Sequence, residues 1–329
     1  CIMAELRWNP LLKDWHMIAS NRQNRPQMPK DYCPFCPSFG NVPDYEVLEY
    51  DNDFPALTQN PPQPDEVGTN FFKVAPNYGK CEVILYSPGH TTTLPELSDA
   101  HMRKLVDLWC ERFNVMKSDE KIKYVFPFEN RGEAVGVTMP HPHGQMYGYS
   151  FIPKRLEVET QNAREYYEEN GRNLFADMLD NERKFGARII FSNEAFTVYL
   201  PFYTDYPYGV YIVPNRQVVY ITELSDHEKD LLGITIRDTV GIFDNLFDYR
   251  FPYMMCMYNA PVNSGDYSAF WRYHIKFFPP MRSAEKQKFN ASSETGAWAN
   301  CNPTCPEETS EELRAAYNRY IAHRPPQDQ

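Results

Sequence analysis

Two segments of the chain arrange their apolar and polar positions in the same order. In each, an apolar strand-like run leads through a turn into a helical pattern, and Ser98 and Ser225 stand directly before the two helical patterns. Serine is a favoured N-cap, and here each serine is followed by an acidic residue, as is typical of a first helical turn. The apolar runs cover 84–86 and 210–213, and the helical patterns end near residues 116 and 247. We therefore predict an internal repeat.

Further strand-like runs follow each predicted helix. They cover 124–128 and 145–152 in the first copy, and 253–258 and 273–278 in the second. Each copy then has the order strand, helix, strands. This order predicts an α+β protein of two related halves, with mainly antiparallel sheets flanked by helices. A coincidental similarity of two unrelated segments is the alternative.

A polar helical pattern over 155–186, rich in Glu, Arg and Asn, separates the two copies. We interpret it as a surface helix that connects an N-terminal half, 1–154, to a C-terminal half, 187–329. Near the end of the chain, 283–306 has an irregular pattern and 310–323 has a helical one.

Composition and charge narrow the class of protein. The 329 residues are 42% hydrophobic and 15% aromatic, which suits two domain-sized units with a sizeable core. The net charge of -11 argues against binding to a nucleic-acid backbone, which needs a basic surface. We expect no membrane association, because no apolar run reaches the length of a membrane span. With no visible signal peptide and eight dispersed cysteines, we expect a reducing cytoplasm.

The pentad His141-Pro142-His143-Gly144-Gln145 carries the strongest chemical signal. Alternate residues of an extended segment share one face, so His141, His143 and Gln145 would project together. An imidazole can bind a metal, transfer a proton or attack phosphorus. A carboxamide can donate a hydrogen bond to a phosphoryl oxygen as its charge changes.

Cys33-Pro34-Phe35-Cys36 has the cysteine spacing of tetrahedral zinc sites. Two more ligands are needed, and His90 and His141 are the best candidates. Four protein ligands would make a closed, structural site, so we expect one structural zinc. A redox dithiol and two unrelated buried cysteines are the alternatives. If His141 binds the metal, His143 is left as the nucleophile and Gln145 as its partner.

An ordered series of motifs resembles the galactose-1-phosphate uridylyltransferase family, the two-repeat branch of the histidine triad superfamily. The resemblance covers nearly the whole chain and implies two tandem histidine-triad-like halves. Its motifs are Asn9-Pro10-Leu11, Ser20-Asn21-Arg22-Gln23-Asn24-Arg25-Pro26, Cys33-Pro34-Phe35-Cys36, Asn52-Asp53-Phe54, Ser87-Pro88-Gly89-His90, Phe128-Glu129-Asn130-Arg131-Gly132, the His141 pentad, Phe277-Phe278-Pro279-Pro280-Met281-Arg282-Ser283 and Lys288-Phe289.

The resemblance implies a ping-pong reaction. His143 would take uridine monophosphate (UMP) from UDP-glucose or UDP-galactose, and a hexose 1-phosphate would then attack the uridylyl-histidine, which Gln145 would stabilise. Asn130 and Thr138 match phosphate contacts, although the family commonly has Ser where Thr138 stands.

The resemblance also assigns the outer parts of the site. Asn52 and Asp53 match positions near the uridine. Lys288, Phe289 and Glu294 match the sugar-phosphate end. Arg22 and Arg25 match a pair that the family supplies from the neighbouring subunit, which implies a homodimer with shared active sites. 

The chain departs from the family at a second metal site, which some members build from one Glu and three His. Glu159 and His274 fit two of those positions, but Tyr258 and Lys276 occupy the others. Because Lys brings positive charge to a cation site, we predict that this metal is absent and that Lys276 pairs with Glu159.

Ala291 and Ser293 replace a Val and a Tyr of the family pattern near the sugar. A roomier pocket would allow a hexosamine 1-phosphate as acceptor. The alternatives to a uridylyltransferase are a nucleotidyl-sugar phosphorylase of the same superfamily and a catalytically silent nucleotide-binding protein.

Overall fold

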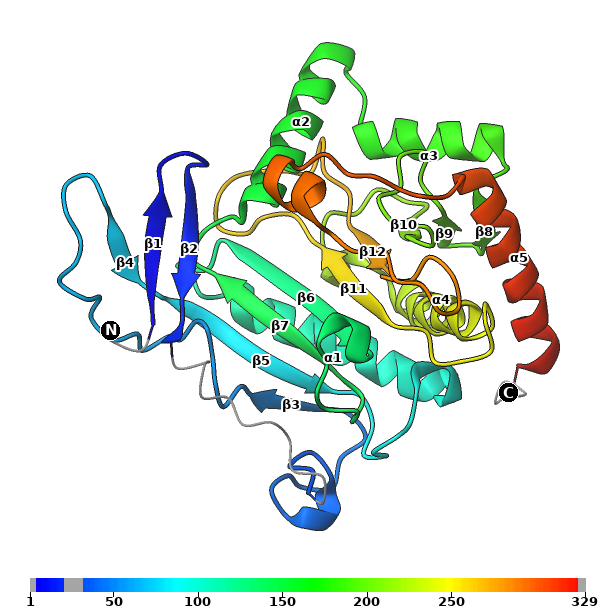
Figure 1. The fold of residues 1–329 in the computed structure, drawn as a ribbon, viewed down its shortest axis with the longest axis horizontal. Coiled ribbons are helices and arrows are strands. Elements are labelled where there is room, and N and C mark those ends of the chain that lie inside the picture. Colours follow the sequence, from blue (N-terminus) through cyan, green and yellow to red (C-terminus); the bar gives the residue numbers. More distant parts are fainter. Residues whose placement is uncertain (1–3, 21–31, 325–329) are drawn as a thin grey trace.

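A single nine-stranded sheet carries both halves of the molecule (Figure 1). The computed structural model describes residues 4–20 and 32–324. The strand order is β3-β5-β7-β6-β11-β12-β10-β9-β8, and every neighbouring pair is antiparallel. The strands are β3 Leu48–Asp51, β5 Gly79–Leu85, β6 Tyr124–Arg131, β7 His143–Tyr149, β8 Ile189–Ser192, β9 Phe196–Tyr199, β10 Tyr211–Pro214, β11 Tyr253–Tyr258 and β12 His274–Phe278. The predicted α+β class with mainly antiparallel pairing is confirmed.

The two halves meet where β6 of the first pairs with β11 of the second. This ladder runs from Tyr253 opposite Arg131 to Cys256 opposite Phe128. The repeated strand patterns therefore form one sheet instead of two separate ones. A smaller sheet, β2-β1-β4, lies at the edge of the first half and contains β1 Glu5–Asn9, β2 Asp14–Ile18 and β4 Val74–Pro76.

The repeated helices α1 (Asp99–Lys117) and α4 (Asp226–Asp244) pack against each other and cover one face of this sheet. Both begin as the sequence predicts: Ser98 Oγ accepts a hydrogen bond from the N–H of His101, and Ser225 Oγ accepts one from the N–H of Glu228. Apolar side chains of both helices share one buried core with the sheet. Short helical turns at Leu94–Glu96 and Ile221–Glu223 precede them, and others occur at Pro37–Phe39, Glu133–Val135 and Ser292–Gly296.

The polar segment between the halves forms two helices instead of the single one predicted. They are α2 (Lys154–Asn170) and α3 (Leu174–Phe185). Gly171 ends α2 with a φ of 64°, a left-handed conformation that glycine adopts without steric cost. The Asn173 side chain then caps α3 by accepting from the N–H of Ala176. The last helix, α5 (Pro306–His323), begins earlier than predicted, with a proline in its first turn, and packs on α4 and β8.

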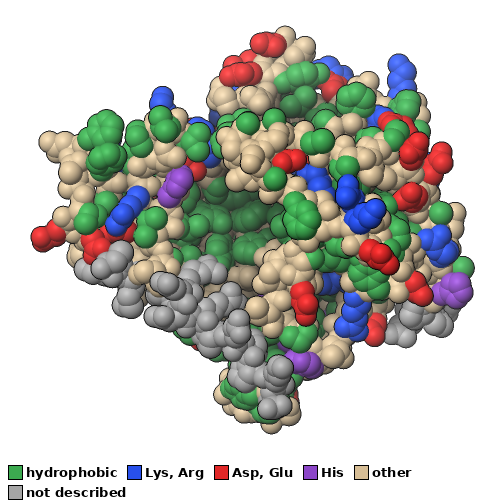
Figure 2. Space-filling model, in the orientation of Figure 1, with side chains coloured by type: hydrophobic (Ala, Val, Ile, Leu, Met, Phe, Trp, Pro, Cys, Tyr) green, Lys and Arg blue, Asp and Glu red, His purple; other side chains and the backbone are tan. Residues whose placement is uncertain are grey.

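The face of the first half opposite α1 carries a row of aromatic rings. Phe126, Phe128, Tyr147 and Tyr149 contact one another in sequence, with ring centroids 5.1–6.0 Å apart. Figure 2 shows a broad hollow in this region, lined by hydrophobic side chains. Among the described residues, no helix is long and apolar enough to cross a membrane.

The crossing of α1 and α4 leads to a stability prediction. A Cβ at Gly233 would lie 3.0 Å from Met102 Cβ and 3.2 Å from the Met102 carbonyl carbon. Because backbone cannot move aside cheaply, Gly233→Ala should lower the free energy of unfolding by about 1–3 kcal/mol, outweighing the gain of about 1 kcal/mol in helix propensity. Urea unfolding measures this. Val115→Ala, at an exposed position on α1, is the control and should stay within about 0.5 kcal/mol of the wild type. A stabilised Gly233→Ala variant would contradict this packing.

Candidate functional site

Four potential metal ligands from three distant segments meet at one point. The ligand atoms of Cys33, Cys36, His90 and His141 all lie within 4.8 Å of one another. His141 Nδ1 is 3.7 Å from Cys33 Sγ and 3.6 Å from Cys36 Sγ, and His90 Nδ1 is 3.4 Å from Cys36 Sγ. A tetrahedral zinc with Zn–S of about 2.3 Å and Zn–N of about 2.0–2.1 Å separates S and N by about 3.6 Å. The cluster therefore has the dimensions of a tetrahedral Cys2His2 site.

Hydrogen bonds to Nε2, the ring nitrogen that faces away from the thiols, fix the orientation of His141. Its Nε2 lies 2.9 Å from the Ser87 carbonyl and 2.8 Å from the Tyr45 hydroxyl, so Nδ1 faces the thiols. Tyr45 in turn donates to the Phe35 carbonyl, between the two cysteines. Burial lowers the pKa of His141 to about 4, which keeps the ring neutral, as a metal ligand must be. Tyr45 was not identified from the sequence, because no local motif marks a residue that acts on His141 from 96 positions away.

His143 begins β7, directly beyond the metal cluster. Its Nδ1 lies 2.7 Å from the carbonyl oxygen of His141. A protonated Nδ1 that donates to this carbonyl leaves the lone pair on Nε2. The Phe35 ring lies 5.9 Å from the His141 ring and 5.8 Å from the His143 ring, so the Cys33–Cys36 loop packs beside both histidines.

A small polar cavity of about 60 Å³ adjoins His143. Gln145, Asn130 and Thr138 line it together with His143, and Gly136, Val137 and Met139 complete the lining. These four side chains come from β7, β6 and the loop between them. Two amides, one hydroxyl and one imidazole around a small space are a suitable set for holding phosphoryl oxygens.

The remaining predicted site residues lie elsewhere. Asn52 and Asp53 form the turn after β3, where Asn52 Oδ1 accepts from the N–H of Phe54 and Asp53 accepts from the Tyr50 hydroxyl. Lys288, Phe289 and Glu294 lie after β12 in the second half; Lys288 Nζ contacts Asn290 Oδ1 at 3.1 Å, and Phe289 is 70% exposed. In the described part of the chain, they do not line the cavity at His143. Arg22 and Arg25 lie outside the described residues.

In the second half, His274 repeats the backbone contact of His143, but its surroundings differ. His274 Nδ1 lies 2.8 Å from the carbonyl of Arg272, which matches the relation of His143 to His141. Two residues along the strand, where the first half has Gln145, the second has Lys276. The His274 ring is 1% exposed and stacks on Tyr258 at 5.0 Å, and burial lowers its pKa to about 3. His274 is therefore held neutral inside the core.

Lys276, which is buried, forms an ion pair with the partly exposed Glu159, as the sequence predicts. Its Nζ lies 3.0 Å from both carboxylate oxygens and 4.6 Å from the centroid of the Tyr258 ring. Burial alone would raise the pKa of Glu159, but Lys276 and Arg155 lower it to about 2. Burial lowers the pKa of Lys276, opposed by Glu159. The pair links α2 to β12 across the sheet face.

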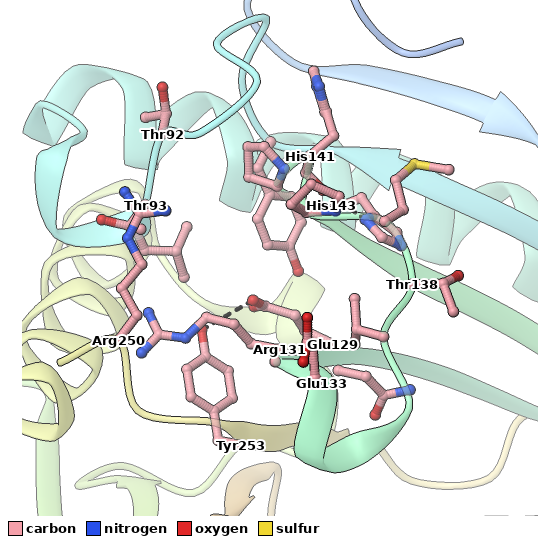
Figure 3. Close-up of a pocket in the computed structure, with 18 residues that line it drawn as sticks. Thr92, Thr93, Glu129, Arg131, Glu133, Thr138, His141, His143, Arg250 and Tyr253 are labelled. Atoms are coloured by element: carbon pink, nitrogen blue, oxygen red, sulfur yellow. Dashed lines mark hydrogen bonds between the residues drawn. The ribbon is translucent and has the colours of Figure 1, made fainter. Parts of the chain in front are cut away.

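A larger cavity of about 270 Å³ adjoins the first one and shares Asn130, Thr138 and His143 with it (Figure 3). The first half contributes 129–133 and 137–143 to its lining, and the second half contributes Arg250 and Tyr253. The carboxyl of Glu129 points into it and accepts a hydrogen bond from the Tyr253 hydroxyl. The sequence analysis did not predict either of them as a site residue, because both lie in or next to apolar runs that indicate core strands.

Family models match both halves of the chain. Residues 2–153 match the galactose-1-phosphate uridyl transferase N-terminal domain, and residues 159–314 match the C-terminal domain of the same family. A galactose-1-phosphate uridylyltransferase from Thermotoga maritima is 38% identical over 95% of this chain and 98% of its own length. The Haemophilus influenzae enzyme of the same name is 31% identical over 94% of this chain and 93% of its own.

Solved structures show the same fold. One described as a uridylyltransferase superposes with a TM-score of 0.88 at 28% identity, covering 96% of this chain and 99% of its own. An ADP-glucose phosphorylase from Arabidopsis thaliana, at 21% identity and a TM-score of 0.74, shares the fold over 94% of this chain and 98% of its own. Together with the family models, these relatives confirm the resemblance drawn from the motifs, and the chain belongs to the galactose-1-phosphate uridylyltransferase family.

Proposed function

We propose that this protein transfers UMP from a UDP-hexose to a hexose 1-phosphate through a uridylyl-histidine at His143. The observation that carries the proposal is the placement of His143: its Nδ1 is held by the His141 carbonyl, and Gln145, Asn130 and Thr138 surround the adjoining cavity. Membership of the family supplies the substrate class. UDP-glucose and UDP-galactose are the expected donors.

The geometry supports a two-step displacement. The lone pair of His143 Nε2 attacks the α-phosphorus, and the bond from that phosphorus to the bridging oxygen breaks, releasing hexose 1-phosphate. A phosphate oxygen of the incoming hexose 1-phosphate then attacks the same phosphorus, and the imidazole leaves. The Nδ1–H donated to the His141 carbonyl stabilises the positive charge that the ring gains in the first step. No general base is required, because the attacking phosphate is already anionic.

Zinc is the metal that the Cys33, Cys36, His90 and His141 set suits best. Two thiols and two imidazoles in tetrahedral spacing are typical of zinc, and four protein ligands leave no open position for chemistry. When bound, the ion would fix the 33–36 loop against Ser87–His90 and against the segment before β7. We infer a structural role: the metal holds His141, whose carbonyl orients His143.

A homodimer would bring Lys288, Phe289 and Glu294 to the active site of the other subunit. These residues do not line the cavity at His143 within their own described chain, and the row of Phe126, Phe128, Tyr147 and Tyr149 offers an apolar face for a second copy. The Arg22 and Arg25 pair would be supplied across the same interface. The seven described cysteines form no disulfide with one another, which suits the cytoplasm as the place of action.

The Glu159–Lys276 ion pair lies at the positions where the resemblance would put the second metal of some family members. An ammonium group already neutralises the carboxylate there, and Tyr258 stacks on His274 instead of adding an imidazole. We therefore propose that this protein binds one metal ion per chain.

Incubation with UDP-glucose, followed by peptide mass spectrometry, tests the function. The wild type should carry a uridylyl group on the peptide that contains His143, and added galactose 1-phosphate should discharge it. His143→Gln should form no adduct and remain folded, because the His143 side chain lies at a cavity and not in the core. His227→Gln, at an exposed position, is the control and should behave as the wild type does. Discharge by inorganic phosphate alone would indicate a phosphorylase, and absence of any adduct would contradict the proposal.

Cys33→Ser should remove one metal ligand and lower stability more than catalysis. We expect less than one zinc per chain by elemental analysis and a lower melting temperature, since a structural zinc contributes directly to the folding free energy. At a temperature where the variant is folded, kcat should stay within about tenfold of the wild type, a loss typical of disturbed support around a metal. Cys301→Ser, an exposed thiol, is the control. Loss of activity at an unchanged melting temperature would show that the metal is catalytic.

Lys276→Met should leave the partly exposed Glu159 carboxylate paired with Arg155 alone. Because that pair remains, we expect a loss of about 1–3 kcal/mol, less than when a fully buried charge is left unpaired, and Glu159→Gln/Lys276→Met should recover part of it. The pKa of Glu159 is lowered from 4.5 to about 2, so the pair's contribution is complete above pH 4.5 and disappears as the pH falls toward 2. Urea unfolding at several pH values measures both effects. Equal stability of the single and double variants would argue against this ion pair.

A further inference from the structure

The sheet divides at the His143 end of β7. Backbone pairing between β6 and β7 ends at Phe128 opposite Gln145. Beyond that point β7 continues to pair with β5, up to Leu85 opposite His143, while β6 continues to pair with β11, up to Arg131 opposite Tyr253. His143 and Asn130 therefore lie on two strands that separate at the candidate site.

Three buried side chains meet at this gap on the core side, and Tyr86 faces Glu129 across it. The Tyr253 hydroxyl on β11 donates to Glu129 Oε1 at 2.9 Å (Figure 3). The Tyr86 side chain, directly after β5, interacts with the same carboxyl. All three side chains are buried, with exposures of 0% for Tyr253, 5% for Glu129 and 1% for Tyr86. They line the cavity of about 270 Å³ that occupies the gap.

Tyr86 is closely tied to the His143 strand. Its backbone N–H donates to the Pro142 carbonyl at 3.0 Å, and its own carbonyl lies 2.7 Å from His101 Nε2. A Cβ at Gly144 would lie only 2.2 Å from the Tyr86 hydroxyl oxygen. The hydroxyl thus lies directly beneath the backbone between His143 and Gln145, so a displacement of Tyr86 would move both.

Glu129 is anchored on the other side of the gap. Burial raises its pKa to about 7, against the effects of Arg131 and the two tyrosine hydroxyls. Arg131 forms an ion pair with Asp244 and lies 4.6 Å over the Tyr253 ring, which fixes this end of the bridge to the second half. Tyr253 donates to one carboxylate oxygen of Glu129, Oε1. Among the described atoms, the other oxygen, Oε2, has no hydrogen-bond partner within normal geometry, and the carboxyl faces Tyr86 in the cavity.

We propose that the Tyr86–Glu129–Tyr253 bridge is a positioning device for the transfer reaction. It takes the place of backbone hydrogen bonds between β6 and β7 beyond Gln145, and it sets the spacing between Asn130 on one strand and His143 with Gln145 on the other. The inference rests on the proposed function and adds three positioning residues to it. None of the three touches the reacting atoms.

A device of this kind should act on the chemical step more than on binding. A nucleophile and its phosphate-contacting groups must meet the phosphorus in one geometry, and a displacement of about 1 Å can cost about a hundredfold in rate. Nucleotide affinity depends on contacts spread over a larger surface, so it should change little. Replacing a residue with a merely structural role would lower the melting temperature without slowing the chemical step selectively at unchanged nucleotide affinity.

The test measures the rate of uridylyl-His143 formation in a single turnover with UDP-glucose, together with the Kd for UDP-glucose and the melting temperature. Glu129→Leu, which fills the space without bridging it, should slow adduct formation by about thirtyfold with Kd within about threefold. Glu129→Gln keeps an acceptor for Tyr253 and should restore the rate to within about threefold of the wild type. Tyr86→Phe removes one hydroxyl and should slow the reaction by about fivefold to tenfold.

Tyr208→Phe is the matched control. Its buried hydroxyl donates to Glu312 at 2.6 Å, far along the chain from the pentad, so its loss should affect melting but not the single-turnover rate. If Glu129→Leu and Tyr86→Phe lowered the melting temperature but kept the wild-type rate, the positioning role would be refuted while the proposed function stood. A Glu129→Gln variant as slow as Glu129→Leu would also refute it. If the wild type formed no adduct, both proposals would fall.

Discussion

Strand β7 has different neighbours along its two edges, and the candidate chemistry depends on this asymmetry. On one edge it pairs with β5 along its whole length. On the other edge it pairs with β6 only as far as Gln145, so His143 lies where the sheet opens. A strand that is hydrogen-bonded on both sides holds a side chain rigidly but leaves little space around its backbone. Release from β6 leaves room for the two adjoining cavities at His143, while pairing with β5 keeps this end of the strand rigid.

The metal cluster and the Tyr86 bridge support the same short segment from two directions. The cluster holds the His141 ring, and the His141 carbonyl orients the His143 imidazole. Tyr86 holds the backbone at Pro142 and Gly144. In the function proposed above, a metal held by this cluster would take no chemical step. It would fix His141, which precedes His143 by two positions. Both supports come from residues far away in the sequence, so only the folded chain assembles them.

The two halves show how one local geometry can serve opposite purposes. Each has a histidine whose Nδ1 lies against the carbonyl two residues earlier. In the first half the next inward-facing partner is Gln145 and the ring adjoins a polar cavity. In the second half the partner is Lys276, and stacked aromatic rings enclose His274. Burial of the second histidine, and an ion pair in place of an amide, give His274 and Lys276 a structural role that links α2 to the shared sheet.

The sequence by itself determined the repeat, the helix N-caps, the α+β class, the Cys2His2 set and the pentad, because these depend on short-range periodicity or on residue types with few other uses. It also indicated the pairing of Lys276 with Glu159. Only the tertiary structure decided that both halves share one sheet and that Lys288, Phe289 and Glu294 do not line the cavity at His143 within the described part of the same chain. The break at Gly171, by contrast, follows from local end and start signals at Gly171 and Asn173 that the sequence prediction did not use. The contacts of Tyr45 with His141, and of Tyr86 with Glu129, were also apparent only from the tertiary structure. Strand register and the contacts of buried polar side chains depend on which segments meet in space, and local sequence does not encode those meetings.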